Sequence, residues 1–572
     1  MNSVELKRKN TKSFYKFLKD KGSSIVSFLV IILHFLSQIY LASYESQTTD
    51  EAVHISAGYT YLIKKDFRFN PEHPIMPKIF CAIPLIFIKP KIPPDNLFWD
   101  KSENYLYDSW RENRSFGEKM LYEYGNNPEQ ILFWTRIPTV IISTLFTTFL
   151  FLFLKKKFND KTATFGILLF VTNPVISSHS HFVTTDIWVS FGFFISIISF
   201  FKFLYKPNLK NGVYLSLSIA FTFLSKFTAI ILIPFFLVYF AFAKRRKTLC
   251  SEIMKYPSKF LLIFLSVWII IIISYLPGLR IPPDSKKLEE IASENKTAIE
   301  LNPKIIPLYD KFRFILIPKD YIKGLAMVIN HTQSGHSSFL LGKTSEKGWW
   351  YYFPIVFLAK NQELFLLLVF FSLVRFFYEK KHEKYNDLNF CFLVFVGIYL
   401  IFSMMSKANL GVRHILPIFA PLIFISAQLS DSKKKKERLF SYFSIFFLTI
   451  QSIFIFPNNL SYFNLFFGGS LNGYKIANGS NLDWGQDLKK IRDYVKMKKL
   501  DKPFIEYGWN GNPSLNYYLG ENYQEGKLID KNKPKGTLII GASALIDEKY
   551  KFLENYKPKL RLTNSVFIYE FD

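Results

Sequence analysis

The sequence lacks the motifs with which many soluble enzymes handle phosphates. It contains no P-loop, no Gly-x-Gly-x-x-Gly turn and no nucleophile elbow, which argues against a cytosolic nucleotide-binding fold. Only three cysteines are present, Cys81, Cys250 and Cys391, and their spacing fits neither a disulfide framework nor a metal site. No internal repeat of the kind common in transporters is visible. The function must therefore be inferred from the apolar and charged segments.

Apolar segments dominate the chain. Phe accounts for 63 of the 572 residues, and aromatic residues make up 18%. Runs such as 260–276 and 363–377 approach the roughly 17–25 apolar residues that cross a bilayer. The composition therefore predicts an α-helical polytopic membrane protein.

The net charge of +27 is concentrated in short connectors between the apolar runs. This placement is typical of cytoplasmic loops under the positive-inside rule and argues against nucleic-acid binding. The basic N-terminal segment has no cleavage site after the first span, so we expect an uncleaved anchor with a cytoplasmic N-terminus. The basic connectors are 155–157, 244–247, 380–381 and 433–436.

Charge placement also orders the spans. The run 212–243 is too long for one membrane-spanning helix, which would also place the basic residues 244–247 outside. A break at Ser225-Lys226-Phe227 gives two passes, keeps these basic residues on the cytoplasmic side and leaves Lys226 recessed below the outer membrane surface. Two large extracytoplasmic loops are expected, at about 44–130 and 277–352, and the interrupted run 74–88 is expected to lie along the interface. Roughly eleven spans result, at 24–42, 131–154, 163–177, 186–204, two passes within 212–243, 260–276, 353–377, 389–405, 415–429 and 439–456.

The composition changes after Pro457, which divides the chain into a transmembrane domain, 1–456, and a small extracytoplasmic α/β domain, 457–572. A helix is expected at 482–498, with Asn481 as its N-cap. Short apolar runs between Gly, Asn and Pro turns predict strands at 504–506, 537–541 and 565–571.

Acidic residues stand at two expected outer helix ends. Asp50 and Glu51 follow the first span, with His54 one turn on, and carboxylates this close to lipid are candidates for function. The alternative is that they are solvated charges at a helix end. Asp186 begins another span, where an acid also stabilises the helix dipole, so a structural role is equally compatible with its position.

Basic residues at the outer connectors form a second group. Lys226 and Arg413-His414 interrupt apolar segments, and a recessed cation at headgroup depth suits a phosphate. Snorkelling to the interface is the alternative. Glu72, His73, His331 and His336 could hold a divalent metal cation, although their spacing is not a recognised ligand set.

Several motifs resemble the C-type (GT-C) membrane glycosyltransferases. The closest branch is the phospholipid-carrier-dependent one, similar to protein O-mannosyltransferases and to the lipid A aminoarabinose transferase. The resemblance covers about residues 25 to 500, and it rests on the order and sidedness of the motifs at 50–51, 70–74, 181–186, 225–227, 345–353, 409–414 and 480–488.

The resemblance implies an inverting transfer of a sugar from a polyprenyl-phosphate donor to a protein, lipid or glycan acceptor at the outer membrane face. Asp50 would be the general base, Lys226 and Arg413 would hold the donor phosphate, and Asp186 and Glu72 would orient the acceptor or a metal. A transporter or flippase of lipid-linked sugars is the alternative. The Lys, Asn, Ile and Phe usage suggests a bacterial source, hence the inner membrane.

Overall fold

The computed structural model describes residues 3–94, 109–245, 257–278, 318–378, 386–507 and 512–572. Several features named above lie outside these ranges: the basic residues 246–247 and 380–381, Cys250, and most of the second loop.

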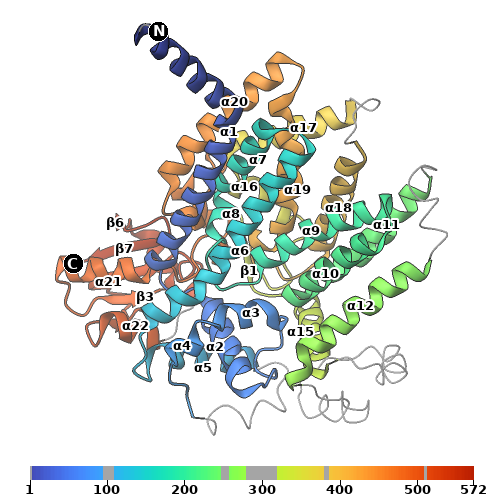
Figure 1. Cartoon of the computed structure of the whole chain (residues 1–572). Coiled ribbons are helices and arrows are strands. Elements are labelled where there is room, and N and C mark those ends of the chain that lie inside the picture. Colours follow the sequence, from blue (N-terminus) through green and yellow to red (C-terminus); the bar gives the residue numbers. More distant parts are fainter. Residues whose placement is uncertain (1–2, 95–108, 246–256, 279–317, 379–385, 508–511) are drawn as a thin grey trace.

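Long apolar helices form the body of the molecule (Figure 1). By length and composition, seven helices of the described ranges could cross a bilayer, or eight if a bent pair counts as one span. The chain is an integral membrane protein, and the expected count of roughly eleven spans remains a prediction. The helices are α1 (Ser3–Tyr44), α6 (Pro128–Lys157), α9 (Asp186–Tyr205), α12 (Pro257–Tyr275, continued by η4, Leu276–Gly278), α18 (Asn386–Met405), α20 (Lys435–Ile455) and the series η5 (Val412–Ile418), α19 (Phe419–Ala427) and η6 (Gln428–Asp431).

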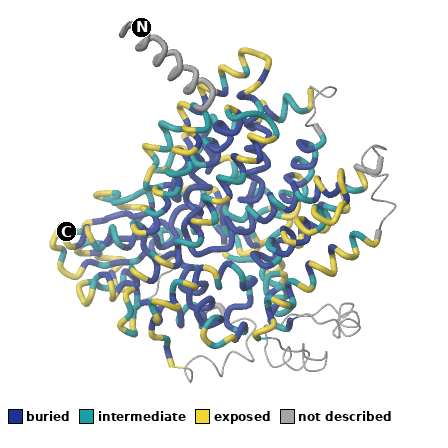
Figure 2. Tube along the Cα trace, viewed as in Figure 1, coloured by how far each residue is buried: buried dark blue, intermediate teal, exposed yellow. Residues whose placement is uncertain are grey.

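The outer helices expose apolar side chains, as expected for a surface that contacts lipid. On α12 the exposed residues include Leu261, Leu262 and Phe264, and on α20 they include Phe454. Figure 2 shows these exposed stretches on the rim of the bundle, whereas α9 in its centre is almost entirely buried.

The break expected near Lys226 is confirmed. Helix α10 (Leu209–Ser225) ends there, and the chain continues through η3 (Phe227–Ile231) into α11 (Leu232–Arg245). Lys226 itself is extended, with φ −157° and ψ 142°, and its side chain is buried. The irregular backbone of Lys226 therefore lies inside the protein, and its amide and carbonyl oxygen are both bonded, to the Thr222 carbonyl oxygen and the Ala229 amide, over 3.2 and 3.0 Å.

Two expected spans are not single helices. The segment 163–177 is divided into α7 (Asp160–Thr172) and α8 (Pro174–Ser178), because Asn173 precedes a proline and caps α8 with its side chain. The expected span at 353–377 is broken, since α16 (Tyr352–Lys360) and α17 (Glu363–Tyr378) are separated by a bend of 118°; whether the pair crosses as one span remains a prediction. Four polar residues, 360–363, interrupt the apolar run at this corner, but polar residues alone do not predict the bend.

The first large loop folds into a layer of short helices at one end of the bundle, opposite the N-terminus (Figure 1). Helices α2 and α5 approach so closely that a Cβ on Gly117 would lie 2.1 Å from the Ala52 carbonyl oxygen. Phe80 and Phe87 are exposed in the expected interfacial segment. The elements are α2 (Thr49–Lys64), α3 (Ile75–Ala82), α4 (Leu85–Ile88) and α5 (Ser109–Tyr122), and the second loop adds α15 (Lys319–Ser334), β1 (Ser338–Leu340) and β2 (Lys343–Ser345).

The C-terminal region carries a mixed five-stranded sheet with strand order β4-β3-β5-β7-β6. Strand β3 is parallel to β4 and β5, whereas β7 is antiparallel to β5 and β6. The three expected strands are confirmed as β3, β5 and β7. The strands are β3 (Phe504–Glu506), β4 (Gln524–Glu525), β5 (Gly536–Gly541), β6 (Leu560–Arg561) and β7 (Val566–Phe571), joined by α22 (Asn512–Leu519), η11 (Gly526–Leu528) and η12 (Glu548–Asn555).

Between α20 and the sheet, the chain makes short 3-10 turns before one regular helix. The expected helix at 482–498 is wrong at its start, because α21 (Leu488–Lys498) begins six residues later. The side chains of 480–487 are buried between the membrane part and the C-terminal sheet instead. The turns are η7 (Asn459–Ser461), η8 (Leu465–Phe467), η9 (Ser470–Lys475) and η10 (Gly479–Asn481).

Candidate active site

Two carboxylates and two cations from four distant segments meet in one cluster, Asp50, Asp186, Lys226 and Arg413. Lys226 Nζ donates a hydrogen bond to Asp186 Oδ1 over 2.6 Å, and Arg413 Nη1 donates to Asp50 Oδ2 over 2.8 Å. The same Nη1 lies 3.4 Å from Asp186 Oδ2, so Arg413 bridges both carboxylates. The four formal charges cancel, which allows them to lie together in a buried place.

Each of the four side chains is placed by a helix end or a helix break. Asp50 lies in the first turn of α2 and Asp186 is the first residue of α9, positions where the helix dipole stabilises an anion. Lys226 occupies the break after α10. Arg413 follows Gly411, whose φ of 144° suits glycine and brings the start of η5 against Ser480.

Exposure separates the two carboxylates. The Asp50 side chain is 20% exposed, whereas that of Asp186 is 1% exposed. A molecule that enters from solvent therefore reaches Asp50 first, and Asp186 lies behind it, between the two cations.

Several polar atoms around the cluster lack a partner within the described part of the chain. They are Nδ1 of His54 and His73, both ring nitrogens of His179, Nε2 of His414 and Nε of Arg413. Buried polar groups are normally hydrogen-bonded, so a set of unpaired ones is typical of a site that receives a polar ligand. Burial lowers the pKa of His54 and of His179 to about 3 and that of His73 well below its ordinary value, which keeps these imidazoles neutral.

Glu51 does not join the cluster. Its carboxylate is fully buried and accepts hydrogen bonds from Arg136 Nε and Nη2, over 2.8 and 2.6 Å. The backbone amides of Thr48 and Val183 donate to the same group. Burial raises the pKa of Glu51, but the Arg136 charge and these hydrogen bonds outweigh it and leave the pKa below its ordinary value. The Glu51 carboxylate is therefore held by Arg136 and by two backbone amides.

The expected metal-binding residues are only partly brought together. His331 Nδ1 lies 3.2 Å from Glu72 Oε1, and the His331 ring is 5.6 Å from the His336 ring. His73 packs instead against His54, with ring centroids 5.6 Å apart. Among the described residues, no group of three or more His, Cys, Asp or Glu side chains has the geometry to hold a metal ion.

A buried lysine fixes the turn that carries Glu72 and His73. Lys78 Nζ donates to the carbonyl oxygens of Asn70 and His73, over 2.5 and 2.9 Å. Burial lowers the pKa of Lys78 to about 7. Lys78 therefore holds the backbone of this turn in place through two hydrogen bonds.

Three residues in or next to the cluster were not expected in these roles: Arg136, which pairs with Glu51, and His179 and Trp484. The Trp484 ring lies 4.3 Å from the Arg413 guanidinium carbon and 5.9 Å from the His179 ring. An arginine in the middle of an apolar run signals a buried ion pair, and Arg136 could have been found in this way. Trp484 lies in the motif at 480–488, whereas His179 carries no such signal, because it contacts Trp484, a residue distant in sequence.

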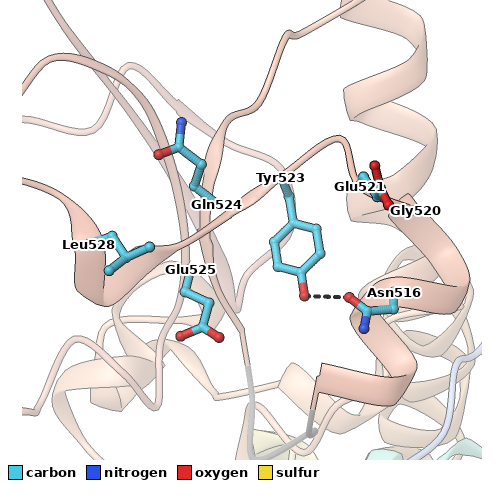
Figure 3. Close-up of a pocket in the computed structure, with 7 residues that line it drawn as sticks. All are labelled: Asn516, Gly520, Glu521, Tyr523, Gln524, Glu525 and Leu528. Atoms are coloured by element: carbon cyan, nitrogen blue, oxygen red, sulfur yellow. Dashed lines mark hydrogen bonds between the residues drawn. The ribbon is translucent and has the colours of Figure 1, made fainter.

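The structure also has a hollow of about 710 Å³ in the C-terminal region, and none of the predicted site residues lines it (Figure 3). Tyr523 donates a hydrogen bond to Asn516 Oδ1 across it, over 2.8 Å. It is lined by Asn516, Gly520, Glu521, Tyr523, Gln524, Glu525 and Leu528.

Comparison with known sequences places part of this site in a family. Residues 130–271 match the dolichyl-phosphate-mannose-protein mannosyltransferases. The matched segment includes Arg136, Asp186 and Lys226, and it covers about a quarter of the chain. A search of curated proteins gave no match.

Two solved structures are similar over nearly the whole length. ArnT from Cupriavidus metallidurans bound to undecaprenyl phosphate is 10% identical, covering 96% of this chain and 98% of its own, with a TM-score of 0.44. The apo state of ArnT from the same organism is 11% identical, covering 95% and 97%, with a TM-score of 0.43. At these values the superposition transfers no site residue.

The structure is that of a polytopic membrane protein, and one segment of it matches a glycosyltransferase family. Residues 130–271 are similar in sequence to the dolichyl-phosphate-mannose-protein mannosyltransferases. The recognition of a GT-C membrane glycosyltransferase from its motifs is confirmed over this segment.

Proposed function

We propose that the protein is an inverting glycosyltransferase that moves a sugar from a polyprenyl-phosphate donor to an acceptor on the outer face of the membrane. The observation that carries this proposal is the convergence of Asp50, Asp186, Lys226 and Arg413 in one cluster. The undecaprenyl phosphate bound by ArnT supports a lipid-phosphate donor.

Asp50 is the general base in this proposal. It takes the proton of an acceptor hydroxyl while that oxygen forms a bond to the anomeric carbon on the face opposite the phosphate. The bond between the anomeric carbon and the phosphate oxygen breaks, and the phosphate leaves as an anion that needs no proton. Asp50 suits the role because it is the more exposed carboxylate of the cluster, and a positioned base contributes about 10²–10⁴-fold to the rate.

Lys226 and Arg413 stabilise the charge that grows on the departing phosphate. Arg413 keeps a donor available, since its ion pairs with Asp50 and Asp186 use Nη1 and its buried Nε has no partner among the described residues. Asp186 acts through both cations, because its contacts hold them in place. His414 lies beside them as a further donor, and His73, Glu72 and His331 form the acceptor side, with or without a divalent cation.

Charge placement supports the sidedness of this site. The cluster lies with the α2–α5 layer, at the end of the bundle opposite the N-terminus (Figure 1), and the positive-inside rule assigns the basic connectors to the cytoplasm. Residues 457–572 are then extracytoplasmic, and the membrane is the bacterial inner membrane.

The test is sugar transfer by the Asp50→Asn variant of the full chain. The variant is expected to bind undecaprenyl phosphate normally and to produce no glycoconjugate, as measured by mass spectrometry of a deletion strain complemented with it. Asp493→Asn, which changes an exposed aspartate, is the control. Normal transfer by Asp50→Asn would exclude Asp50 as the base. Movement of lipid-linked sugar between the two leaflets of vesicles that contain the purified protein, without sugar transfer, would favour the alternative of a flippase.

A further inference from the structure

The segment 480–488, here named the clamp, joins the C-terminal region to two parts of the membrane domain. On one side it binds the link between α1 and α2. The amides of Ser46 and Thr49 each donate over 3.0 Å, to the carbonyl oxygens of Gln486 and Trp484 respectively. Thr49 directly precedes Asp50, so the clamp fixes the backbone from which the proposed base projects.

On its other side the clamp binds the approach to Arg413. The Val412 amide donates to Asn481 Oδ1 over 2.9 Å, and Ser480 Oγ donates to the Leu410 carbonyl oxygen over 2.5 Å. The Trp484 ring lies 4.3 Å from the Arg413 guanidinium carbon. A cation held over an indole face in a buried place is fixed in both position and orientation.

The base of the clamp is fastened to the C-terminal sheet. Asp487 Oδ2 accepts hydrogen bonds from Thr563 Oγ1 and Ser565 Oγ, over 2.8 and 2.6 Å. Asp483 Oδ2 accepts one from the Ser543 amide over 3.1 Å. The clamp therefore has a fixed end in the sheet and a contact surface at the cluster.

We propose that the clamp is a positioning element of the reaction site, in which Trp484 sets the Arg413 guanidinium against Asp50. This inference rests on the proposed function. It assigns the C-terminal domain a part in the reaction: Asp50 and Arg413 lie 363 positions apart, and the clamp contacts the neighbours of both.

The first test measures the initial rate of sugar transfer in membranes that contain the native donor and acceptor. Trp484→Ala removes the ring and keeps the backbone carbonyl that binds Thr49. The rate is expected to fall by about 100-fold, as for a small misplacement of reacting groups, and Trp484→Phe should restore most of it. The control, Trp134→Ala, removes a half-exposed tryptophan of α6 that pairs with Phe133 and should keep the wild-type rate.

The second test asks whether Trp484 acts through Arg413. Undecaprenyl phosphate affinity is measured for the purified full chain, with Trp484→Ala made in the wild type and in Arg413→Ala. The expected result is roughly a tenfold loss in the wild type and no further loss in Arg413→Ala, as for coupled residues. Equal losses in both would show that the ring acts without Arg413 and would overturn the proposal.

The two proposals fail in different ways. Normal sugar transfer by Asp50→Asn would contradict the proposed function, regardless of the result for the Trp484 variants. An inactive Asp50→Asn variant together with a wild-type rate for Trp484→Ala would contradict only the positioning role of Trp484. Thermal unfolding in detergent checks that each variant is folded. If Trp484→Ala does not fold, Trp484→Leu replaces it, because leucine keeps apolar bulk without an aromatic face.

Discussion

Lys226 Nζ lies 2.6 Å from Asp186 Oδ1, so the break after α10 is joined directly to the start of α9. If Lys226 also holds the donor phosphate, Lys226→Ala should weaken undecaprenyl phosphate binding at least tenfold, since it removes a charged donor from a buried site. Acceptor binding should change less. The control is Lys202→Ala, an exposed lysine of α9. Equal loss of donor and acceptor binding would contradict the phosphate assignment.

Glu51 and Asp50 should respond differently to loss of charge. Glu51→Gln leaves Arg136 without a counter-ion in a fully buried place, and breaking such a pair costs about 3–5 kcal/mol. We expect a large drop in the melting temperature in detergent. Lys155→Met, which breaks a solvent-exposed pair with Asp160, should cost less than about 1 kcal/mol. A wild-type melting temperature for Glu51→Gln would show that the pair contributes little to stability.

Asp483 should make stability depend on pH. Burial and the nearby Asp487 raise the pKa of Asp483 from 3.8 to about 7. Between these values the folded chain keeps a proton that the unfolded chain has lost, so stability falls as pH rises from about 4 to about 7, by up to about 1.4 kcal/mol per pH unit. Asp483→Asn removes this loss.

The melting temperature of Asp483→Asn should therefore equal that of the wild type near pH 4 and exceed it at pH 8. Asp493→Asn, at an exposed position, is the control and should follow the wild type at both values. A constant difference between Asp483→Asn and the wild type across this range would be inconsistent with the raised pKa.

Gly324 controls the contact between α15 and the turn that carries Glu72. A Cβ at this position would lie 1.8 Å from the Pro71 carbonyl oxygen, so Gly324→Ala must push α15 away. We expect a loss of about 1–3 kcal/mol from overpacking, measured by thermal unfolding, and a weaker His331–Glu72 contact. Gly397→Ala in α18 has open space around the new methyl group and should be neutral or stabilising. Equal behaviour of both variants would contradict the steric argument.

Local sequence signals predicted the features that depend on local physics. The break at Lys226 followed from the excess length of one apolar run, and strand β3 from a short run between turn residues. Asp50 and Glu51, by contrast, are neighbours with the same chemistry, so the sequence could not separate them. Only the position of Arg136, 85 residues away from Glu51, directs one carboxylate into the protein and leaves the other at the cluster.

The missed features depend on contacts between distant segments. The corner after Lys360 carries the polar residues 360–363, which bond to distant segments, and the polar residues of 480–487 looked like the first turns of a helix. This segment packs against Ser46, Val412 and Arg413 on one side and against the C-terminal sheet on the other, because those contacts outweigh the preference for helix. Tertiary contacts of this kind leave no local pattern to read.

The corner between α16 and α17 also bears on the order in which the protein can be completed during synthesis. Lys360 at this corner is buried, and its ammonium donates to the carbonyl oxygens of Leu460 and Asn481, which follow it by 100 and 121 residues. Both acceptors leave the ribosome long after α16 has entered the bilayer. The two hydrogen bonds of Lys360 can therefore form only after Leu460 and Asn481 have been translated. Until then the lysine must be solvated or paired with another group. A chain truncated before Leu460 would lack both acceptors, so quality-control proteases should degrade it quickly even with all of its apolar spans inserted.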